Sequence, residues 1–324
     1  MTTVLITSGG RRVALVRAFR RAVASVGGGR VLVADVVPTA PALYAADQGV
    51  LVPPCDDPGC APALLALCRR EGVRLLVPTT DREQPMLVAA RDAFHAAGVR
   101  VALSGPETVA IAADKRATAA FFARAGIPAP CLLDLAAALD GAPIRFPVVL
   151  KPRFGSASIG VHVVHDLEAL RFFAGRVPDP LLQEHCDGDE YTLDVLVGPD
   201  GGVACVVPRR RLETRGGEIA KGYTVHDPEL ETWGREVAER LPDAWGPITL
   251  QCFTRAGAPP AFLEINPRFG GGYPLAAEAG ADYARWLLEW ALGLPSTARP
   301  DGWRDRVAML RYDEAVFVPQ EAAS

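Results

Sequence analysis

The sequence predicts an α/β protein that begins with a doubly wound parallel sheet and continues into a strand-rich α+β region. Three observations lead to this fold class. Short apolar strands alternate with helices over residues 1–105, a glycine- and serine-rich hairpin joins two strands near the middle, and a late strand ends in alternating polar residues followed by three glycines. Alternation of apolar strands with helices is typical of a parallel sheet that is covered on both faces.

The first domain contains four apolar segments that we predict to be buried strands, at residues 4–6, 31–35, 75–78 and 99–103. Helical periodicity covers residues 11–26 and 61–71, and another helix precedes the last of these strands. Residues 104–106 read Ser-Gly-Pro, a turn-rich junction at which we end the first domain.

Polar residues follow the first and third of these strands, at the edge of the sheet where such folds bind ligands. Residues 8–10 form a Ser-Gly-Gly turn, but the turn lacks the GxGxxG spacing of a dinucleotide-binding protein. The next two residues, Arg11 and Arg12, suit an anionic group better. With Asp81 and Glu83 of the later loop they are candidate substrate contacts, although ordinary surface charges would give the same pattern.

The middle of the chain predicts a phosphate-binding element. A strand at residues 146–152 carries Lys151, and the segment 155–160 (Gly-Ser-Ala-Ser-Ile-Gly) leads into a strand at 161–164. Small residues let the N–H groups and hydroxyls of such a hairpin surround phosphate oxygens, and the lysine supplies the opposite charge. The hairpin is not a P-loop, because no Gly-Lys-Ser/Thr precedes a helix. A hairpin without a ligand is the alternative.

Two strands joined by an acidic turn follow, over residues 181–195. The turn can offer backbone groups to a base and a carboxylate to ribose hydroxyls, and a solvated hairpin is the alternative. A later strand carries the basic run 209–211 and continues toward Arg215 and Lys221. This run is too short and too mixed with acidic residues for a nucleic-acid surface, so we interpret it as a strand that faces a polyphosphate.

Glu264, Asn266 and Arg268 alternate along a strand that begins with the apolar residues 261–263. A period of two places the three side chains on one face. They suit a metal and a phosphate, because Mg²⁺ prefers oxygen ligands and a guanidinium pairs with phosphoryl oxygens. The glycines at 270–272 then let the backbone approach a ligand closely. An exposed strand end followed by a turn is the alternative.

The strand at residues 248–253 is predicted to pair with this late strand, which would put Gln251 near Glu264. A helix over residues 274–292 and a last strand at 307–312 complete the predicted fold.

Composition argues against several classes of function. The 324 residues carry a net charge of −4, which gives no electrostatic case for a nucleic-acid or membrane partner. The seven cysteines form no CxxC pair, so neither a zinc site nor a disulfide framework is indicated. An odd number of cysteines without a secretory leader predicts the reducing cytoplasm. Apolar sheet edges in the first domain are compatible with a homodimer.

The ordered set of motifs resembles the ATP-grasp superfamily, and in particular its carbamoyl-phosphate-synthase-like members. The set comprises Lys115, Lys151-Pro152, the 155–160 hairpin, Gln183-Glu184 with Glu190, Gln251, and Glu264-Ile265-Asn266-Pro267-Arg268. Single motifs are weak, but their order over essentially the whole chain is specific. The resemblance implies a pre-ATP-grasp domain (1–105), a first ATP-grasp part with the phosphate lid (106–178) and a second part with the metal site (179–324).

The resemblance also implies roles for individual residues. The ATP phosphates would be contacted by two lysines and the lid, namely Lys115, Lys151, Gly155, Ser156, Ser158 and Gly160. The base and ribose would be held by the strand end and acidic turn, namely Gln183, Glu184, His185, Cys186 and Glu190. Mg²⁺, or Mn²⁺, would be held by Gln251, Glu264 and Asn266. The transferred phosphoryl group would be stabilised by Arg268, Lys151 and Arg211. The resemblance adds Arg215, and the glycine segment adds Gly271, to the candidate substrate contacts Arg11, Arg12, Asp81 and Glu83 named above.

The implied activity is ATP-dependent ligation of a carboxylate to an amine through an acyl phosphate, which forms an amide on a small amino-acid-like or peptide-like substrate. Such chemistry relies on positioning and charge neutralisation, so no covalent nucleophile is required. A carboxylate kinase and a nucleotide-binding protein without turnover are the alternatives. Two departures from the family pattern stand out. Gln183 replaces the first of a frequent pair of glutamates, and Gln251 stands where many members have an acid, which leaves Glu264 as the main anionic ligand.

Overall fold

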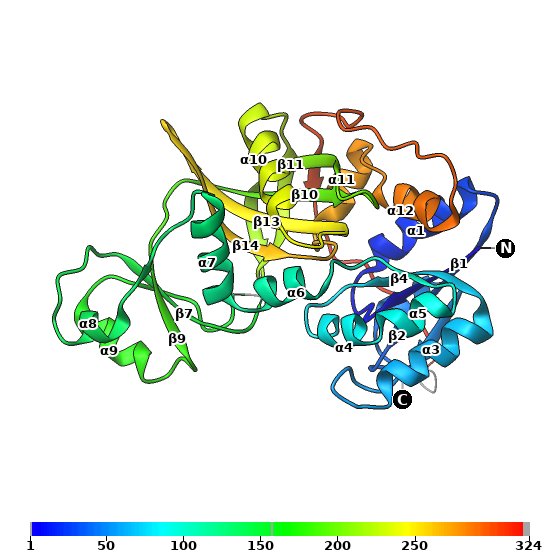
Figure 1. The fold of residues 1–324 in the computed structure, drawn as a ribbon, viewed down its shortest axis with the longest axis horizontal. Helices are drawn as coiled ribbons and strands as arrows, with labels where there is room; N and C mark the ends of the chain where they lie inside the picture. Colours follow the sequence, from blue (N-terminus) through cyan, green and yellow to red (C-terminus); the bar gives the residue numbers. More distant parts are fainter. Residues whose placement is uncertain (1, 157, 320–324) are drawn as a thin grey trace.

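The computed structural model describes residues 2–156 and 158–319, and within them the chain forms three sheets (Figure 1). The first is the predicted parallel sheet, with the strand order β3-β2-β1-β4-β5. Its strands are β1 (Thr2–Thr7), β2 (Gly29–Asp35), β3 (Gln48–Leu51), β4 (Val73–Pro78) and β5 (Arg100–Val101). The helices of this region are α1 (Val13–Ser25), α2 (Pro41–Ala45), α3 (Cys60–Glu71), α4 (Gln84–Ala89) and α5 (Arg91–Ala96).

Helices on both faces explain why the central strands of this sheet carry consecutive apolar residues. Successive side chains of a strand point to opposite faces. Val4 and Ile6 of β1 therefore pack in the cluster that contains Phe19 of α1, whereas Leu5 packs in the cluster that contains Leu64 of α3.

The second sheet has four antiparallel strands in the order β6-β9-β7-β8 and lies at the far left end of the molecule in Figure 1. Two helices lead into it from the first sheet, α6 (Pro106–Ala113) and α7 (Lys115–Ala125). Its elements are β6 (Leu132–Leu133), α8 (Leu135–Leu139), β7 (Val148–Pro152), β8 (His162–Val164), α9 (Leu167–Ala174) and β9 (Pro180–Glu184). The sheet and its helices enclose a hydrophobic cluster of their own, which contains Leu150, Leu170 and Leu182.

The third sheet has six antiparallel strands in the order β14-β13-β10-β11-β12-β15. Its elements are β10 (Asp189–Val197), β11 (Val203–Arg215), β12 (Glu218–Thr224), α10 (Pro228–Arg240), β13 (Gly246–Arg255), β14 (Ala258–Asn266) and β15 (Ala308–Leu310). In the β13–β14 register Gln251 lies opposite Glu264, which confirms the predicted pairing.

The prediction of one helix over residues 274–292 is wrong. The segment forms two helices, α11 (Tyr273–Ala279) and α12 (Tyr283–Leu292). Gly280 separates them with a φ of +117°, and its N–H caps the carbonyls at the end of α11. A residue with a side chain rarely adopts this conformation, so the glycine allows the break.

The C-terminal helices pack against the first sheet, and α12 lies beside α1 (Figure 1). One hydrophobic cluster includes Val4 and Phe19 of the first sheet and its helix together with Phe269 and Leu287 of the C-terminal region. The rings of Phe19 and Phe269 meet edge to face, with centroids 5.8 Å apart. The first sheet therefore shares its core with the end of the chain. Among the described residues no helix combines the length and hydropathy needed to cross a bilayer.

Candidate active site

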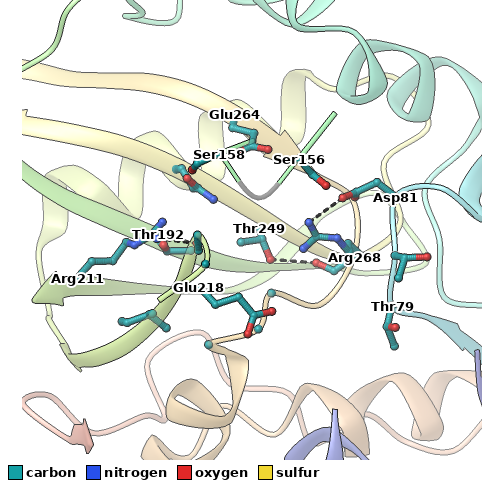
Figure 2. Close-up of a pocket in the computed structure, with 18 of the residues that line it drawn as sticks. Thr79, Asp81, Ser156, Ser158, Thr192, Arg211, Glu218, Thr249, Glu264 and Arg268 are labelled. Carbon is teal, nitrogen blue, oxygen red and sulfur yellow. Dashed lines mark hydrogen bonds and ion pairs between the residues drawn. The ribbon is translucent and has the colours of Figure 1, made fainter. Parts of the chain in front are cut away.

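A cavity of about 290 Å³ is lined from all three sheets (Figure 2). The loop after β4 contributes residues 79–82, the hairpin between β7 and β8 contributes Ser156 and Ser158, and the third sheet contributes side chains of β10, β11, β13 and β14. The glycine- and serine-rich hairpin and the late polar strand, which are about a hundred residues apart in the sequence, thus share one cavity.

Gln251 and Glu264 lie side by side in this cavity because β13 and β14 pair in register. The carboxylate of Glu264 has no hydrogen bond or ion pair to any residue that the structure describes, and Figure 2 shows it near Ser156 and Ser158 of the hairpin. Ala157, at the tip of the predicted phosphate lid, lies outside the described residues. A free carboxylate beside a carboxamide is a suitable donor pair for a divalent cation.

Two lysines, the buried Lys151 and the half-buried Lys115, lie within electrostatic reach of Glu264. Lys151, at the end of β7, donates from Nζ to Gln183 Oε1 at 2.6 Å. Burial, reinforced by the neighbouring charge of Lys115 and opposed by Glu264, lowers the pKa of Lys151 to about 8. Lys115 begins α7 and donates from Nζ to the carbonyl of Gly155 at 2.7 Å. Burial lowers the pKa of Lys115, and the charge of Glu264 opposes that shift. Lys115 therefore ties the hairpin to the body of the protein.

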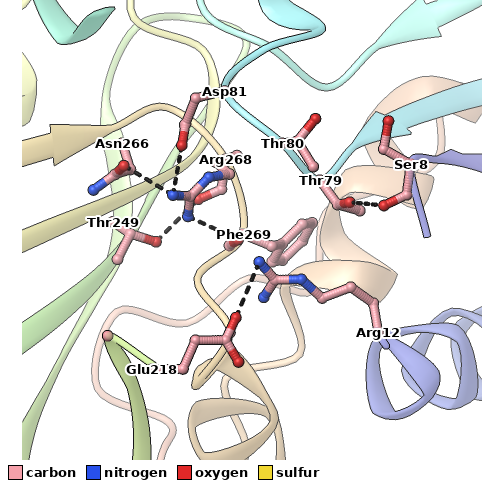
Figure 3. Close-up of polar contacts among 12 residues, drawn as sticks. Ser8, Arg12, Thr79, Thr80, Asp81, Glu218, Thr249, Asn266, Arg268 and Phe269 are labelled. Atoms are coloured by element: carbon pink, nitrogen blue, oxygen red, sulfur yellow. Dashed lines mark hydrogen bonds and ion pairs between the residues drawn. The ribbon is translucent and has the colours of Figure 1, made fainter. Parts of the chain in front are cut away.

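Arg268 connects the first sheet to the third. Its Nη2 donates to Asp81 Oδ2 at 2.8 Å and to Asn266 Oδ1 at 2.9 Å (Figure 3). Its Nε is buried and has no hydrogen-bond partner among the described residues. Asn266 itself does not line the cavity, since its oxygen turns to Arg268. Of the three predicted metal ligands, Gln251 and Glu264 face the cavity, and the prediction of Asn266 as a third ligand receives no support from this arrangement.

Two arginines of β11 face the cavity from buried positions. Arg209 is 1% exposed and donates to both carboxylate oxygens of Asp194, from Nε at 2.6 Å and from Nη2 at 3.1 Å. Its Nη1 is buried without a hydrogen-bond partner in the described part of the chain. Arg211 forms an ion pair with Glu190 at 2.9 Å. The carboxylate of Glu190, which was predicted to hold ribose, is thus paired with the guanidinium of Arg211.

The glycines at 270–272 are required by close packing rather than by unusual backbone angles. A Cβ on Gly271 would collide with the carboxylate of Glu218, and one on Gly272 would collide with Nη1 of Arg209. Glu218 also pairs with Arg12 at 3.5 Å and with Arg311 at 2.9 Å. The loop therefore holds its backbone directly against charged groups of the cavity wall.

Three predicted substrate contacts lie elsewhere. Arg11 is exposed and does not line the cavity, because the turn after β1 directs only Arg12 inward. Arg215 is exposed near the end of β11 and lies 3.8 Å from Glu213. Glu83 is buried beneath the loop after β4, where Oε1 accepts the backbone N–H groups of residues 79 and 80 at 2.9 Å each. Glu83 therefore shapes the loop instead of meeting a ligand there.

The residues predicted to line the base form a separate cavity of about 570 Å³. Glu184, His185 and Cys186 line it together with Phe253 of β13. Gln183 does not, because its amide is held between Lys151 and the carbonyl of Pro130 at 3.0 Å.

Several lining residues of the first cavity carried no signal in the sequence. Threonines and glycines are too common to stand out, and Glu218 sits in a turn that looks solvent exposed. The members that sequence reasoning missed are Thr79, Thr80, Arg82, Thr192, Gly216, Gly217, Glu218, Ile219 and Thr249.

Comparison with known proteins identifies two segments. Residues 4–102 match the family described as PylC-like, N-terminal domain, and residues 176–314 match the family described as ATP-grasp in the biosynthetic pathway with Ter operon. Residues 176–314 are thus identified as an ATP-grasp segment. The two matches together cover the parallel sheet and the strands that carry Gln251 and Glu264, with Arg268 just beyond them.

Solved structures show the same fold. The biotin carboxylase domain of 2-oxoglutarate carboxylase from Hydrogenobacter thermophilus, solved with MgADP, ADP and bicarbonate, has a TM-score of 0.71 and 17% identity over 94% of this chain and 73% of that one. The ADP complex of an N5-carboxyaminoimidazole ribonucleotide synthetase has a TM-score of 0.73 and 16% identity over 93% of this chain and 79% of that one.

Curated relatives are similar over part of their length. The D-alanine–D-alanine ligase of Fusobacterium nucleatum is 26% identical over 131 residues, which are 38% of this chain and 46% of the relative. An uncharacterized protein, y4rH of Sinorhizobium fredii, is 26% identical over 187 residues, which are 51% of this chain and 38% of the relative. The chain therefore matches less than half the length of these relatives.

Proposed function

We propose that this protein is an ATP-dependent ligase that joins a small carboxylate to an amine through an acyl phosphate. One observation carries the proposal: Glu264 and Gln251, the serines of the β7–β8 hairpin and Arg268 all line one cavity. Similarity to a D-alanine–D-alanine ligase and to an N5-carboxyaminoimidazole ribonucleotide synthetase supports the same class of reaction.

The residues present fit a nucleotide and a divalent cation. No group of three or more His, Cys, Asp or Glu side chains in the described ranges is placed to hold a metal by itself. A magnesium ion is typically held by one or two carboxylates plus the oxygens of a substrate phosphate. Glu264 and Gln251 would hold it here, and the ion would neutralise charge on the phosphates. The cavity lined by Glu184, His185, Cys186 and Phe253 would take the adenine.

The proposed reaction has two steps. A carboxylate oxygen attacks the γ-phosphorus of ATP, the bond from that phosphorus to the β–γ bridging oxygen breaks, and ADP leaves. The amine nitrogen then attacks the acyl carbon, phosphate leaves, and the nitrogen releases a proton, which forms the amide. Lys151, Arg211 and Arg268 would stabilise the negative charge that spreads over the transferred group in both steps. The hairpin with Ser156 and Ser158 would exclude water from the acyl phosphate.

A screen of amino acids tests the proposal by ADP release and product analysis. The ligase proposal requires ADP formation that depends on both a carboxylate and an amine, with an amide as the product. Hydroxylamine distinguishes the kinase alternative, since hydroxamate formation that needs no natural amine indicates that the reaction stops at the acyl phosphate. Absence of ADP with every carboxylate mixture in the presence of Mg²⁺ would leave a nucleotide-binding protein without turnover.

Replacing Lys151 by alanine is expected to weaken nucleotide binding. A hydrogen bond to a charged group contributes about 1.5–3 kcal/mol, so the Kd for ADP should rise by about 10- to 150-fold. Isothermal titration calorimetry measures this directly. Lys221→Ala is the matched control, because Lys221 is exposed on β12, pairs with Glu213 and does not line the cavity. An unchanged Kd in Lys151→Ala rules out the proposed phosphate contact.

The same lysine gives nucleotide binding a pH dependence. Because burial lowers the pKa of Lys151 to about 8, its ammonium group loses its proton as the pH rises through that value. Affinity for ADP should therefore fall between pH 7.5 and pH 9.5. Lys151→Arg should abolish the fall, since a guanidinium keeps its charge over this range.

A further inference from the structure

A second cavity of about 280 Å³ adjoins the active-site cavity on the side of the first sheet. Thr80 and Arg82 line both cavities, so both spaces border the loop after β4. The second cavity lies at the carboxyl ends of β1 and β2, where Ser8 and Val36 line it, and Leu64 of α3 forms part of its wall. Ligands of doubly wound sheets bind at this edge.

The wall of this cavity is mostly apolar. Val36, Val52, Pro53, Pro54 and Leu64 contribute alkyl surface. Val52, Pro53 and Pro54 directly follow β3, the short strand that the sequence did not predict. An apolar group that enters the cavity leaves water, which favours binding by about 25 cal/mol for each Å² of apolar surface buried.

The acidic groups of the wall are already engaged. Asp35 Oδ2 accepts the N–H of Gly10 at 2.7 Å, and its Oδ1 accepts the N–H of Val37 at 3.0 Å. Glu83 Oε2 accepts the hydroxyl of Ser8 at 2.9 Å. Its Oε1 accepts the N–H and the hydroxyl of Thr80 at 2.9 and 3.1 Å.

Among the described residues that line this cavity, Arg82 is the one cation, and it lies 3.8 Å from Asp56 at the mouth, where both side chains are largely exposed to water. An acidic ligand group would therefore meet no counter-charge in the inner part of the cavity. Placing an unpaired charge in such surroundings is strongly unfavourable. The wall consequently selects against acidic side chains, and its alkyl surface favours apolar ones.

We propose that this cavity, defined here as the side-chain pocket, binds the apolar side chain of an amino-acid substrate whose reacting group lies in the active-site cavity. The inference rests on the proposed ligase function and adds a substrate class to it. In Figure 3 Thr79 and Thr80 precede Asp81, which turns toward Arg268, and the hydroxyl of Thr79 donates to the carbonyl of Ser8 at 2.6 Å. The volume suits a side chain of leucine or phenylalanine size.

Val36 and Val37 provide a matched pair of variants. Val36 lines the side-chain pocket and is 48% exposed, whereas its neighbour Val37 is 47% exposed and does not line it. Tryptophan at either position projects from an exposed loop, so neither variant fills the hydrophobic core. Val36→Trp narrows the pocket, and Val37→Trp adds the same apolar surface without reaching it.

The experiment compares steady-state ADP release with L-leucine, L-phenylalanine, L-alanine, L-glutamate and L-lysine as the varied substrate. Wild-type protein should prefer leucine or phenylalanine. Val36→Trp should raise the KM for the preferred amino acid at least about tenfold, the scale on which loss of alkyl contacts lowers selectivity. The KM for alanine and for ATP should change less than about twofold, and Val37→Trp should match the wild type.

Two results would overturn the side-chain pocket: preference of the wild type for glutamate or lysine, or equal effects of both tryptophan variants on every amino acid. If no amino acid supports ADP formation, the ligase proposal fails and the pocket is judged by calorimetric binding of L-leucine. Binding that Val36→Trp weakens and Val37→Trp preserves upholds the pocket. Absent binding to the wild type, or equal binding to all three proteins, refutes it.

Discussion

Glu264→Gln is expected to lower kcat by at least about 10²–10³-fold while the protein stays folded. Glu264 is the carboxylate that faces the active-site cavity from β14, and Gln251 beside it carries no charge. The substitution keeps the size and the hydrogen-bonding oxygen but removes the negative charge that would attract Mg²⁺ to the nucleotide phosphates. ADP release at increasing Mg²⁺ concentration measures the loss, and the thermal unfolding midpoint checks the fold.

Glu239→Gln is the control for this substitution. Glu239 lies on the exposed face of α10, 3.7 Å from Arg235 and far from the residues that line the cavity. Its variant should turn over at the wild-type rate. A Glu264→Gln protein that keeps the full kcat at ordinary Mg²⁺ concentrations would show that the metal is held elsewhere, and the proposed site would have to be abandoned.

Asp194→Ala is expected to lower the free energy of unfolding by about 3–5 kcal/mol. Asp194 accepts two hydrogen bonds from Arg209, and both side chains are almost completely buried between β10 and β11. Removal of the carboxylate leaves the guanidinium buried without its counter-charge. Because the attraction of two buried charges only offsets their desolvation, the large loss comes from isolating one charge. Equilibrium unfolding in urea measures the change.

An exposed ion pair on the same sheet serves as the comparison. Asp187 and Arg255 lie 3.2 Å apart with side chains that are 72% and 67% exposed. Asp187→Ala should cost less than about 1 kcal/mol, because water screens such a pair. A double variant, Asp194→Leu with Arg209→Met, should regain most of the stability lost in Asp194→Ala. Equal losses for Asp194→Ala and Asp187→Ala would show that the buried pair contributes no more than the exposed one.

The sequence predicts the first sheet and the β13–β14 pair well because both rest on strong local signals. Strands β1, β2 and β4 each contain an apolar run of at least three residues, and helices separate them. The pairing of β13 with β14 follows from the short connection between them, and two register shifts along the pair place Gln251 opposite Glu264. The same kind of signal misleads at residues 274–292, where the helical period continues across Gly280 although the backbone does not.

The parts of the site that escaped prediction depend on long-range pairing. Arg209 meets Asp194 only because β10 and β11 lie side by side, and nothing near either residue specifies that partner. The turn after β1 leaves Arg11 exposed to solvent and directs Arg12 toward Glu218 in the cavity wall. In the sequence Glu83 has the features of a ligand-binding acid. In the structure its Oε1 accepts hydrogen bonds from the backbone N–H groups of Thr79 and Thr80 instead.

The hydrophobic core is divided unevenly, and this division determines which part of the molecule can rotate as a rigid body. The four-stranded sheet encloses an apolar cluster of its own, whereas the parallel sheet is fused through Phe19 and Phe269 to the C-terminal helices. A sheet with its own hydrophobic core can rotate as a rigid body at little cost in free energy. Separating the parallel sheet from the C-terminal helices would instead break the hydrophobic core that they share. We therefore expect nucleotide binding to move the four-stranded sheet toward the rest of the molecule. Small-angle scattering with and without ADP would detect the resulting decrease in the radius of gyration. Substrates would enter, and products would leave, on the side of the four-stranded sheet.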